Sequence, residues 1–343
     1  MEKVPRISIE EYGIPNAAEY SNFQFNKWDI NRFRKNFKVN IVGQSEDKRE
    51  LEFDMIGCTA ALINAFRRIL LSEVPSMAID KVHILMNTSL IQDEVLAHRL
   101  GLLPLKADPS LFEYCTADER LDDEAEMNDG TTLKYELKVI CSKNTSADKY
   151  SRLPEDIYNN SRVKSKAIKW IPLHRQSELY PNGKELFGML EDEILIAKMV
   201  PGQEIDAILY AVKGIGKDHA KFSPVATASY RLMPVITLKR RFFGTEADLL
   251  EKSFSKGTIE LVKNEKRGEL EARLVDARYD NCSRNVFRHE SLKNSVKLER
   301  IADHFIFNVE SVGAVEPGVL FLQAVKVLKK KCRTFLDELD SIN

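Results

Sequence analysis

The sequence predicts an α+β protein in which short strands and a few helices form more than one domain. Two segments near the N-terminus alternate apolar and polar residues, as half-buried strands do, and a strongly apolar helical segment, 59–74, follows them. Short alternating segments then fill the middle of the chain, and residues 319–343 carry a second helical stripe. At 343 residues the chain is long enough for two compact domains.

Residues 1–36 are expected to form an extended N-terminal arm. Turn-forming residues punctuate 10–16, and four aromatic side chains stand in otherwise polar sequence. These are Phe23, Phe25, Trp28 and Phe33. Such a segment can be a free tail, but the four aromatic residues favour docking on a larger surface.

From residue 37 onward we expect a sheet with a helix on one face. Apolar residues alternate with polar or opposite-face residues in 37–41 and in 51–55, and a further strand is expected at 82–86. The order strand, strand, helix, strand is typical of a sheet covered on one face.

The helix predicted over 59–74 has an unusually broad apolar face. Apolar residues recur at helical spacing at Leu62, Ala65, Phe66, Ile69 and Leu70. Ile63 and Val74 widen this face to about half the helix circumference, more than the ~100° stripe that a single core requires. Arg67 borders the face and Arg68 lies opposite it, while Pro75 ends the helix. We therefore expect this helix to pack against its own sheet and against another protein.

Residues 89–232 are expected to form a β-rich insert. Residues 133–139 alternate cleanly, and shorter strands are predicted at 168–171, 194–197 and 205–211 with turn sequences between them. Beyond the insert, 246–302 is highly charged with at least one helix, and 305–309 is expected to be a strand that returns to the first sheet.

The C-terminal segment predicts a long helix with a heptad-like stripe. Its members, spaced 4, 3, 4, 3 and 4 residues apart, are Phe321, Val325, Leu328, Cys332, Phe335 and Leu339. Such a helix could simply cap its own sheet. The face is broadened, however, by Leu320, Leu322, Ala324, Val327 and Leu336. That breadth predicts a helix that covers the sheet and also pairs with a partner helix.

Composition argues against several classes of protein. The formal net charge of −1 gives no overall attraction to nucleic acid or membrane. No apolar run approaches the ~20 residues that span a bilayer, and the N-terminus lacks a signal-peptide core. The five cysteines are widely spaced and never form a C-x-x-C pair, which favours a reducing compartment and makes zinc unexpected.

No motif in the sequence predicts catalysis. Residues 213–217 resemble a phosphate loop but lack its spacing, so a tight turn is expected there. The acidic stretch 118–130 could hold magnesium, but such runs are usually solvated loops. The six histidines are isolated, without a zinc or nucleophile motif. A hydrolase or transferase is therefore disfavoured, and a nucleic-acid-binding protein would need a more concentrated basic face. We expect no cofactor.

Several motifs, taken in their order along the chain, resemble those of the alpha-like subunits of DNA-directed RNA polymerases. These are residues 64–72, 78–80, 97–105, 216–224 and 307–313, and the resemblance covers roughly 37–340. Within this family the chain is most similar to the alpha-like subunits shared by eukaryotic RNA polymerases I and III. The polymerase II equivalent carries a cysteine cluster after the His-Arg-Leu-Gly segment, where only Cys115 stands here. That equivalent is the alternative assignment.

The resemblance implies a fold and a set of partners. The fold is like the N-terminal domain of the polymerase alpha subunit, with a discontinuous dimerisation domain, 37–88 and 233–343, interrupted by the 89–232 insert. The implied function is non-catalytic assembly in the nucleus, including the nucleolus, through a heterodimer with a smaller alpha-like subunit. Further implied partners are the second-largest subunit, contacted by Arg67 and Arg68, and small zinc-binding subunits; no sequence-specific DNA contact and no membrane are expected.

Overall fold

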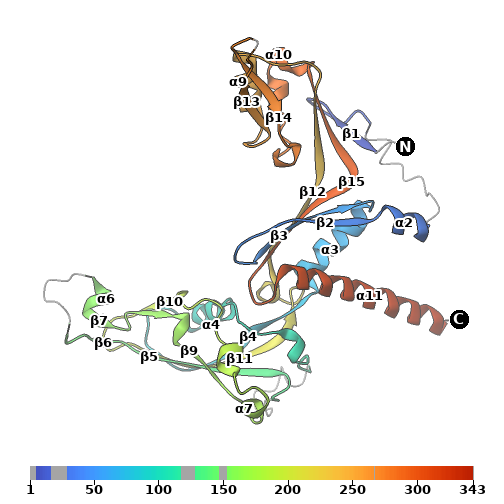
Figure 1. The fold of residues 1–343 in the computed structure, drawn as a ribbon. Helices are drawn as coiled ribbons and strands as arrows, with labels where there is room; N and C mark the ends of the chain where they lie inside the picture. Colours follow the sequence, from blue (N-terminus) through green and yellow to red (C-terminus); the bar gives the residue numbers. More distant parts are fainter. Residues whose placement is uncertain (1–4, 17–28, 117–127, 147–152, 266, 343) are drawn as a thin grey trace. The chain divides into compact units, whose positions relative to one another are not determined.

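The computed structural model describes residues 5–16, 29–116, 128–146, 153–265 and 267–342 of the chain (Figure 1). These residues form helices and antiparallel sheets, so the predicted α+β class is confirmed. The chain divides into two compact units whose segments alternate along the sequence. Unit 1 comprises Met1–Gly43, Glu52–Asn64 and Ser229–Asn308. Unit 2 comprises Gln44–Leu51, Ala65–Ala228 and Val309–Asn343.

The strands are β1 (Arg6–Ile9), β2 (Lys38–Gln44), β3 (Glu50–Ile56), β4 (Pro75–Asn87), β5 (Thr132–Ile140), β6 (Ser142–Lys143), β7 (Tyr158–Asn159), β8 (Arg162–Lys164), β9 (Ile168–Ile171), β10 (Leu195–Lys198), β11 (Glu204–Ile215), β12 (Val225–Leu238), β13 (Ile259–Lys263), β14 (Leu270–Leu274) and β15 (Val296–Ser311). The α-helices are α2 (Ile30–Asn36), α3 (Ala60–Ser72), α4 (Asp93–Gly101), α6 (Pro154–Ile157), α7 (Gln176–Leu179), α8 (Gly183–Leu186), α9 (Thr245–Ser253), α10 (Glu290–Lys293) and α11 (Pro317–Ile342). Short 3₁₀ turns are η1 (Pro109–Leu111), η2 (Ser165–Ala167), η3 (Ala220–Phe222), η4 (Ala277–Tyr279) and η5 (Asn285–Arg288).

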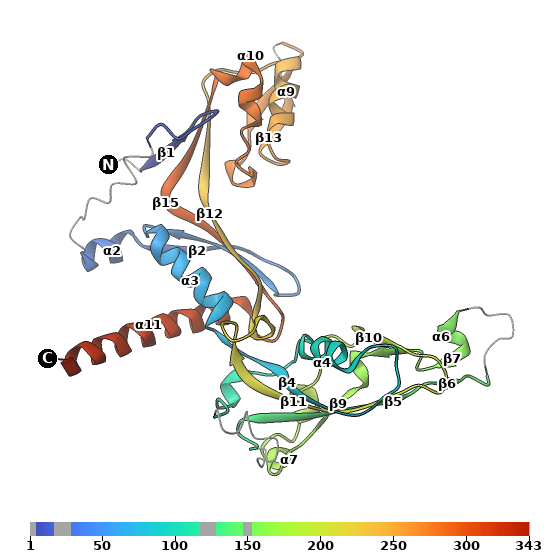
Figure 2. The same ribbon diagram turned by 180° about the vertical axis from the view of Figure 1, so that it is seen from behind.

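Unit 1 is built on a sheet in the order β1-β15-β3-β2, with β12 also paired to β15. The long strands β12 and β15 lie side by side in both views (Figures 1 and 2). Phe53 of β3 stacks on Phe307 of β15 with ring centroids 5.3 Å apart. The predicted strand at 305–309 and its return to the first sheet are therefore confirmed.

A second apolar core in unit 1 lies among α9, α10, β13 and β14. Its largest fully buried side chain is Phe242, and Leu250 and Leu292 are also fully buried. Arg278 of η4 joins β3 through a buried ion pair, in which its guanidinium lies 2.5 Å from a carboxylate oxygen of Asp54. Because 224 residues separate these two side chains, the pair fixes the highly charged segment to the sheet.

Unit 2 contains a four-stranded antiparallel sheet in the order β4-β11-β5-β9. The inward residues of β5, from Leu133 to Val139, are buried in alternation, as predicted. Helix α4 packs on β4, where a Cβ at Gly101 would lie 3.4 Å from the carbonyl oxygen of Ile79. Arg99 donates from this helix to the backbone carbonyls of Leu195 and Ile196. The His-Arg-Leu-Gly sequence therefore has a structural role in this unit.

Strand β4 differs from the strand predicted at 82–86. It begins at Pro75 and pairs with β11, so the expectation that it joins the sheet of β2 and β3 is wrong. Two register shifts against β11 leave Asp80 and Leu85 of β4 without opposite residues. Such bulges change which face later side chains occupy, and this interrupts the period-two pattern. The predicted insert begins just after β4, yet β4 pairs with β11, which lies inside that insert.

The described part of the N-terminal segment contributes a strand to the sheet of unit 1. Strand β1 pairs antiparallel with β15, with Arg6 opposite Ile301. In α2, Phe33 stacks on Phe37 with ring centroids 5.0 Å apart. Phe23, Phe25 and Trp28 lie outside the described residues. The functional domain boundaries remain a prediction. In the described part of the chain, no helix has the length and apolar character needed to cross a membrane.

Candidate protein–protein interface

Helix α3 is held at both ends by backbone and side-chain contacts. The Thr59 hydroxyl accepts a hydrogen bond from the backbone N–H of Leu62 at its N-terminus. At its C-terminus, the backbone N–H of Lys217 donates to the Ser72 carbonyl at 2.8 Å. This approach requires Gly216, since a Cβ there would lie 2.2 Å from the Leu71 carbonyl oxygen. The segment that resembled a phosphate loop therefore ends β11 and caps α3.

The broad apolar face of α3 is used largely within the chain. Phe66 is only 7% exposed, and Ile69 and Leu70 are buried as well. Leu62 and Arg67 are half-buried, whereas Arg68 is exposed. Another protein could therefore contact the edge of α3 formed by Leu62, Arg67 and Arg68, whereas the buried residues pack within the chain.

Helix α11 is buried only at its N-terminal end. Pro317 starts the helix, and Leu320 and Ala324 are fully enclosed within the chain. Phe321 packs against Phe66 with ring centroids 5.1 Å apart. Farther along, Lys331 Nζ lies 2.8 Å from a carboxylate oxygen of Glu73. The first turns of α11 are thus fixed on α3, as expected of a helix that covers its own chain.

Most of the rest of the α11 stripe is exposed to solvent, and Leu328 is half-buried. Val325, Cys332, Phe335 and Leu339 are all exposed, and Phe335 reaches 62%. The flanking apolar residues Leu322 and Leu336 are exposed too. From residue 329 to its end, every described side chain of α11 is exposed. Sequence reasoning missed Ile342, which is 80% exposed and continues the stripe at the next spacing of three.

This exposed length is substantial for a single helix. Fourteen residues, 329–342, extend it by roughly 21 Å at 1.5 Å per residue. Isolated helices of about this length are marginal in water, and continuous apolar surfaces on soluble proteins usually mark interaction sites. The helix runs to the C-terminus as one continuous rod (Figures 1 and 2). The geometry is that of a helix that presents one apolar side to a partner.

Strand β2 is a second apolar surface that alternation did not reveal as exposed. The predicted strand is confirmed, but all seven of its residues are exposed, including Val39, Ile41 and Val42. It stands at the end of the sheet order in unit 1, so one of its edges pairs with no strand among the residues that the structure describes. Alternation indicates a strand but does not tell whether a neighbour covers it.

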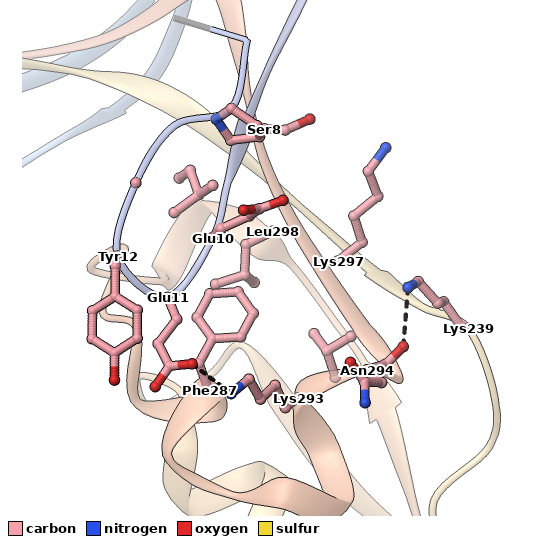
Figure 3. A pocket seen from close by; sticks show the side chains of 14 residues that line it. Ser8, Glu10, Glu11, Tyr12, Lys239, Phe287, Lys293, Asn294, Lys297 and Leu298 are labelled. Atoms are coloured by element: carbon pink, nitrogen blue, oxygen red, sulfur yellow. Dashed lines mark hydrogen bonds and ion pairs between the residues drawn. The ribbon is translucent and has the colours of Figure 1, made fainter.

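A pocket of about 710 Å³ in unit 1 lies between the turn after β1 and strand β15 (Figure 3). Lys239, Lys293 and Lys297 are among its lining residues. The hydrogen-bonded ion pair with Lys293, 2.6 Å away, lowers the pKa of the Glu11 carboxyl. Lys239 Nζ donates to the Asn294 carbonyl at 3.0 Å. No histidine or cysteine is among these lining residues, and the third lysine, Lys297, pairs with Glu299 at 2.8 Å.

The described residues hold no group of three or more histidine, cysteine, aspartate or glutamate side chains that could bind a metal ion. Most of the acidic stretch 118–130 lies outside the described residues. All five cysteines are free thiols. Burial raises the pKa of Cys58 to about 12, while Cys332 stands exposed in the α11 stripe.

Comparisons with known proteins agree with this architecture. Residues 52–332 match the family described as the RNA polymerase Rpb3/Rpb11 dimerisation domain. The chain is 49% identical to "DNA-directed RNA polymerases I and III subunit RPAC1" of Mus musculus, over 98% of this chain and 96% of that protein. It is 44% identical to the Saccharomyces cerevisiae protein of the same description, over 95% and 96%. Identity to "DNA-directed RNA polymerase II subunit rpb3" of Dictyostelium discoideum is 32%, over 79% and 85%.

Proposed function

Because the chain belongs to the RNA polymerase Rpb3/Rpb11 dimerisation-domain family, we propose that it is an assembly subunit shared by DNA-directed RNA polymerases I and III. The higher identity to RPAC1 proteins than to the polymerase II relative supports this choice. In this role it would act in the nucleus, including the nucleolus, in the synthesis of ribosomal RNA precursors, 5S rRNA and tRNA.

The proposed molecular role is to form a heterodimer with a smaller alpha-like subunit. The exposed apolar stripe of α11 is the observation that carries this proposal. Val325, Cys332, Phe335 and Leu339 of this stripe are exposed to solvent, while Phe321 is packed against Phe66 inside the chain. A partner helix that covers the stripe would remove its apolar surface from water and stabilise the exposed turns.

The edge of α3 that carries Leu62, Arg67 and Arg68 is a second surface that we propose for contact with polymerase subunits. We assign Arg68 to contact with the second-largest polymerase subunit, because its guanidinium is exposed and an arginine binds carboxylates or carbonyls through a planar fork. Arg67 is half-buried, so its stem contributes packing as well as charge. Small zinc-binding subunits are further proposed partners, and the contribution to RNA synthesis is architectural.

Co-expression tests this proposal directly. The full chain is expressed alone and together with the smaller alpha-like subunit, and the soluble fraction is analysed by size-exclusion chromatography. We expect a soluble one-to-one complex, and poor solubility of the chain alone because α11 exposes its stripe. A tagged chain purified from cells should also carry the large subunits of polymerases I and III. A stable monomer that recovers no polymerase subunit would contradict the proposal.

A further inference from the structure

A band of positive charge runs beside the apolar stripe of α11. Residues 326–333 contain basic side chains at Lys326, Lys329, Lys330, Lys331 and Arg333 and no acidic side chain. Lys331 is paired with Glu73. We call the other four residues the cationic band. All four are exposed, and none of them forms an ion pair with any residue that the structure describes.

The spacing of the cationic band places it on one side of the helix. Its members follow one another at i, i+3, i+4 and i+7, and at about 100° per residue these positions share one side. Val325 and Leu336, which belong to the exposed apolar surface, lie next to it on the helix. Like charges at these spacings repel one another and destabilise an isolated helix. A partner that supplies negative charge would remove this repulsion.

The charges farther along α11 limit which kinds of molecule could bind the cationic band. Asp337, Glu338 and Asp340 follow the cationic band within two turns. A uniform polyanion such as nucleic acid or an anionic membrane would be attracted by the first block and repelled by the second. A second copy of the chain, packed antiparallel, would offer three carboxylates to four unpaired cations. A helix of a different protein can carry one acidic side chain for each of the four cations.

We propose that the cationic band recognises acidic residues that flank the apolar stripe of the partner helix. This inference rests on the proposed heterodimer and adds the chemistry that selects the partner. The apolar stripe supplies most of the buried surface, whereas the charges steer encounter and orient the two helices. Because the cationic band lies at the solvent-exposed rim of the stripe, its contribution to binding affinity should decrease as the salt concentration rises.

The test compares two full-length variants in complex with the smaller alpha-like subunit. The band variant carries Lys326→Glu, Lys329→Glu, Lys330→Glu and Arg333→Glu. The control carries the same change in net charge on exposed lysines of the insert, namely Lys143→Glu, Lys169→Glu, Lys184→Glu and Lys198→Glu. The dissociation constant of each labelled complex is measured by dilution at low and at high salt, and circular dichroism checks that helix content is kept.

We expect the band variant to bind about tenfold or more weakly than wild type at low salt, with little difference at high salt, while the control matches wild type. Equal affinity of band variant and control would overturn the inference. If Phe335→Ala with Leu339→Ala still weakens the complex in that case, the heterodimer stands and only the charge recognition fails. Loss of self-association or of oligonucleotide binding in the band variant, with unchanged partner affinity, would also overturn it.

Discussion

Truncating the outer part of the α11 stripe should weaken the heterodimer without unfolding the chain. Phe335 and Leu339 are 62% and 43% exposed, which together amounts to about one fully exposed large side chain. Covering one such side chain contributes about 1.5–3 kcal/mol, so Phe335→Ala with Leu339→Ala should raise the dissociation constant about 10- to 150-fold. Alanine is a strong helix former, so the helix itself should be retained.

The matched control is Leu179→Ala with Leu186→Ala in the insert. These leucines are 61% and 45% exposed, so the control removes a similar amount of exposed apolar surface. Dilution of each labelled full-length complex with the smaller alpha-like subunit gives the dissociation constants, and thermal unfolding reports on the fold. If both double variants bind with the same affinity, the assignment of the α11 stripe to the interface is refuted.

Three further perturbations test separate parts of the account. Arg68→Ala should leave the heterodimer intact but reduce recovery of the second-largest subunit in a reconstitution, and unchanged recovery would remove Arg68 from that contact. Gly216→Ala should destabilise the chain by about 1–3 kcal/mol in urea unfolding, because its Cβ would lie 2.2 Å from the Leu71 carbonyl oxygen, whereas Gly43→Ala has open space and should be close to neutral. Arg278→Leu should destabilise unit 1 by about 3–5 kcal/mol, because it leaves the buried Asp54 carboxylate without its guanidinium partner, and a wild-type unfolding curve would show that the pair is dispensable.

The two long helices were predictable because their apolar residues keep a helical period over many turns. The sequence could not tell which part of each apolar face serves the chain itself. Ile69 and Leu70 are as apolar as Phe335, yet they are enclosed in the chain while Phe335 is exposed. This division depends on how α3 and α11 pack together, and Phe66 and Phe321 meet although 255 positions separate them in the sequence.

The strands show a different limit. Alternation located β2, β3 and β5, but it did not predict that β2 is exposed at the end of its sheet. It also failed over the first half of β4, where Met77, Ala78 and Ile79 are buried one after another and a bulge at Asp80 follows them. The Arg278–Asp54 ion pair likewise has no local signal, since tertiary structure alone brings the two residues together.

Protection of Cys332 tests the central claim most directly. Its thiol lies exposed in the α11 stripe, whereas Cys58 and Cys141 are buried and serve as internal references in the same chain. Alkylation rates at each cysteine, measured by mass spectrometry, are compared between the free chain and its complex with the smaller alpha-like subunit. We predict rapid modification of Cys332 in the free chain and at least about tenfold slower modification in the complex, because a covered thiol is inaccessible. Equal rates in the two states would contradict the account.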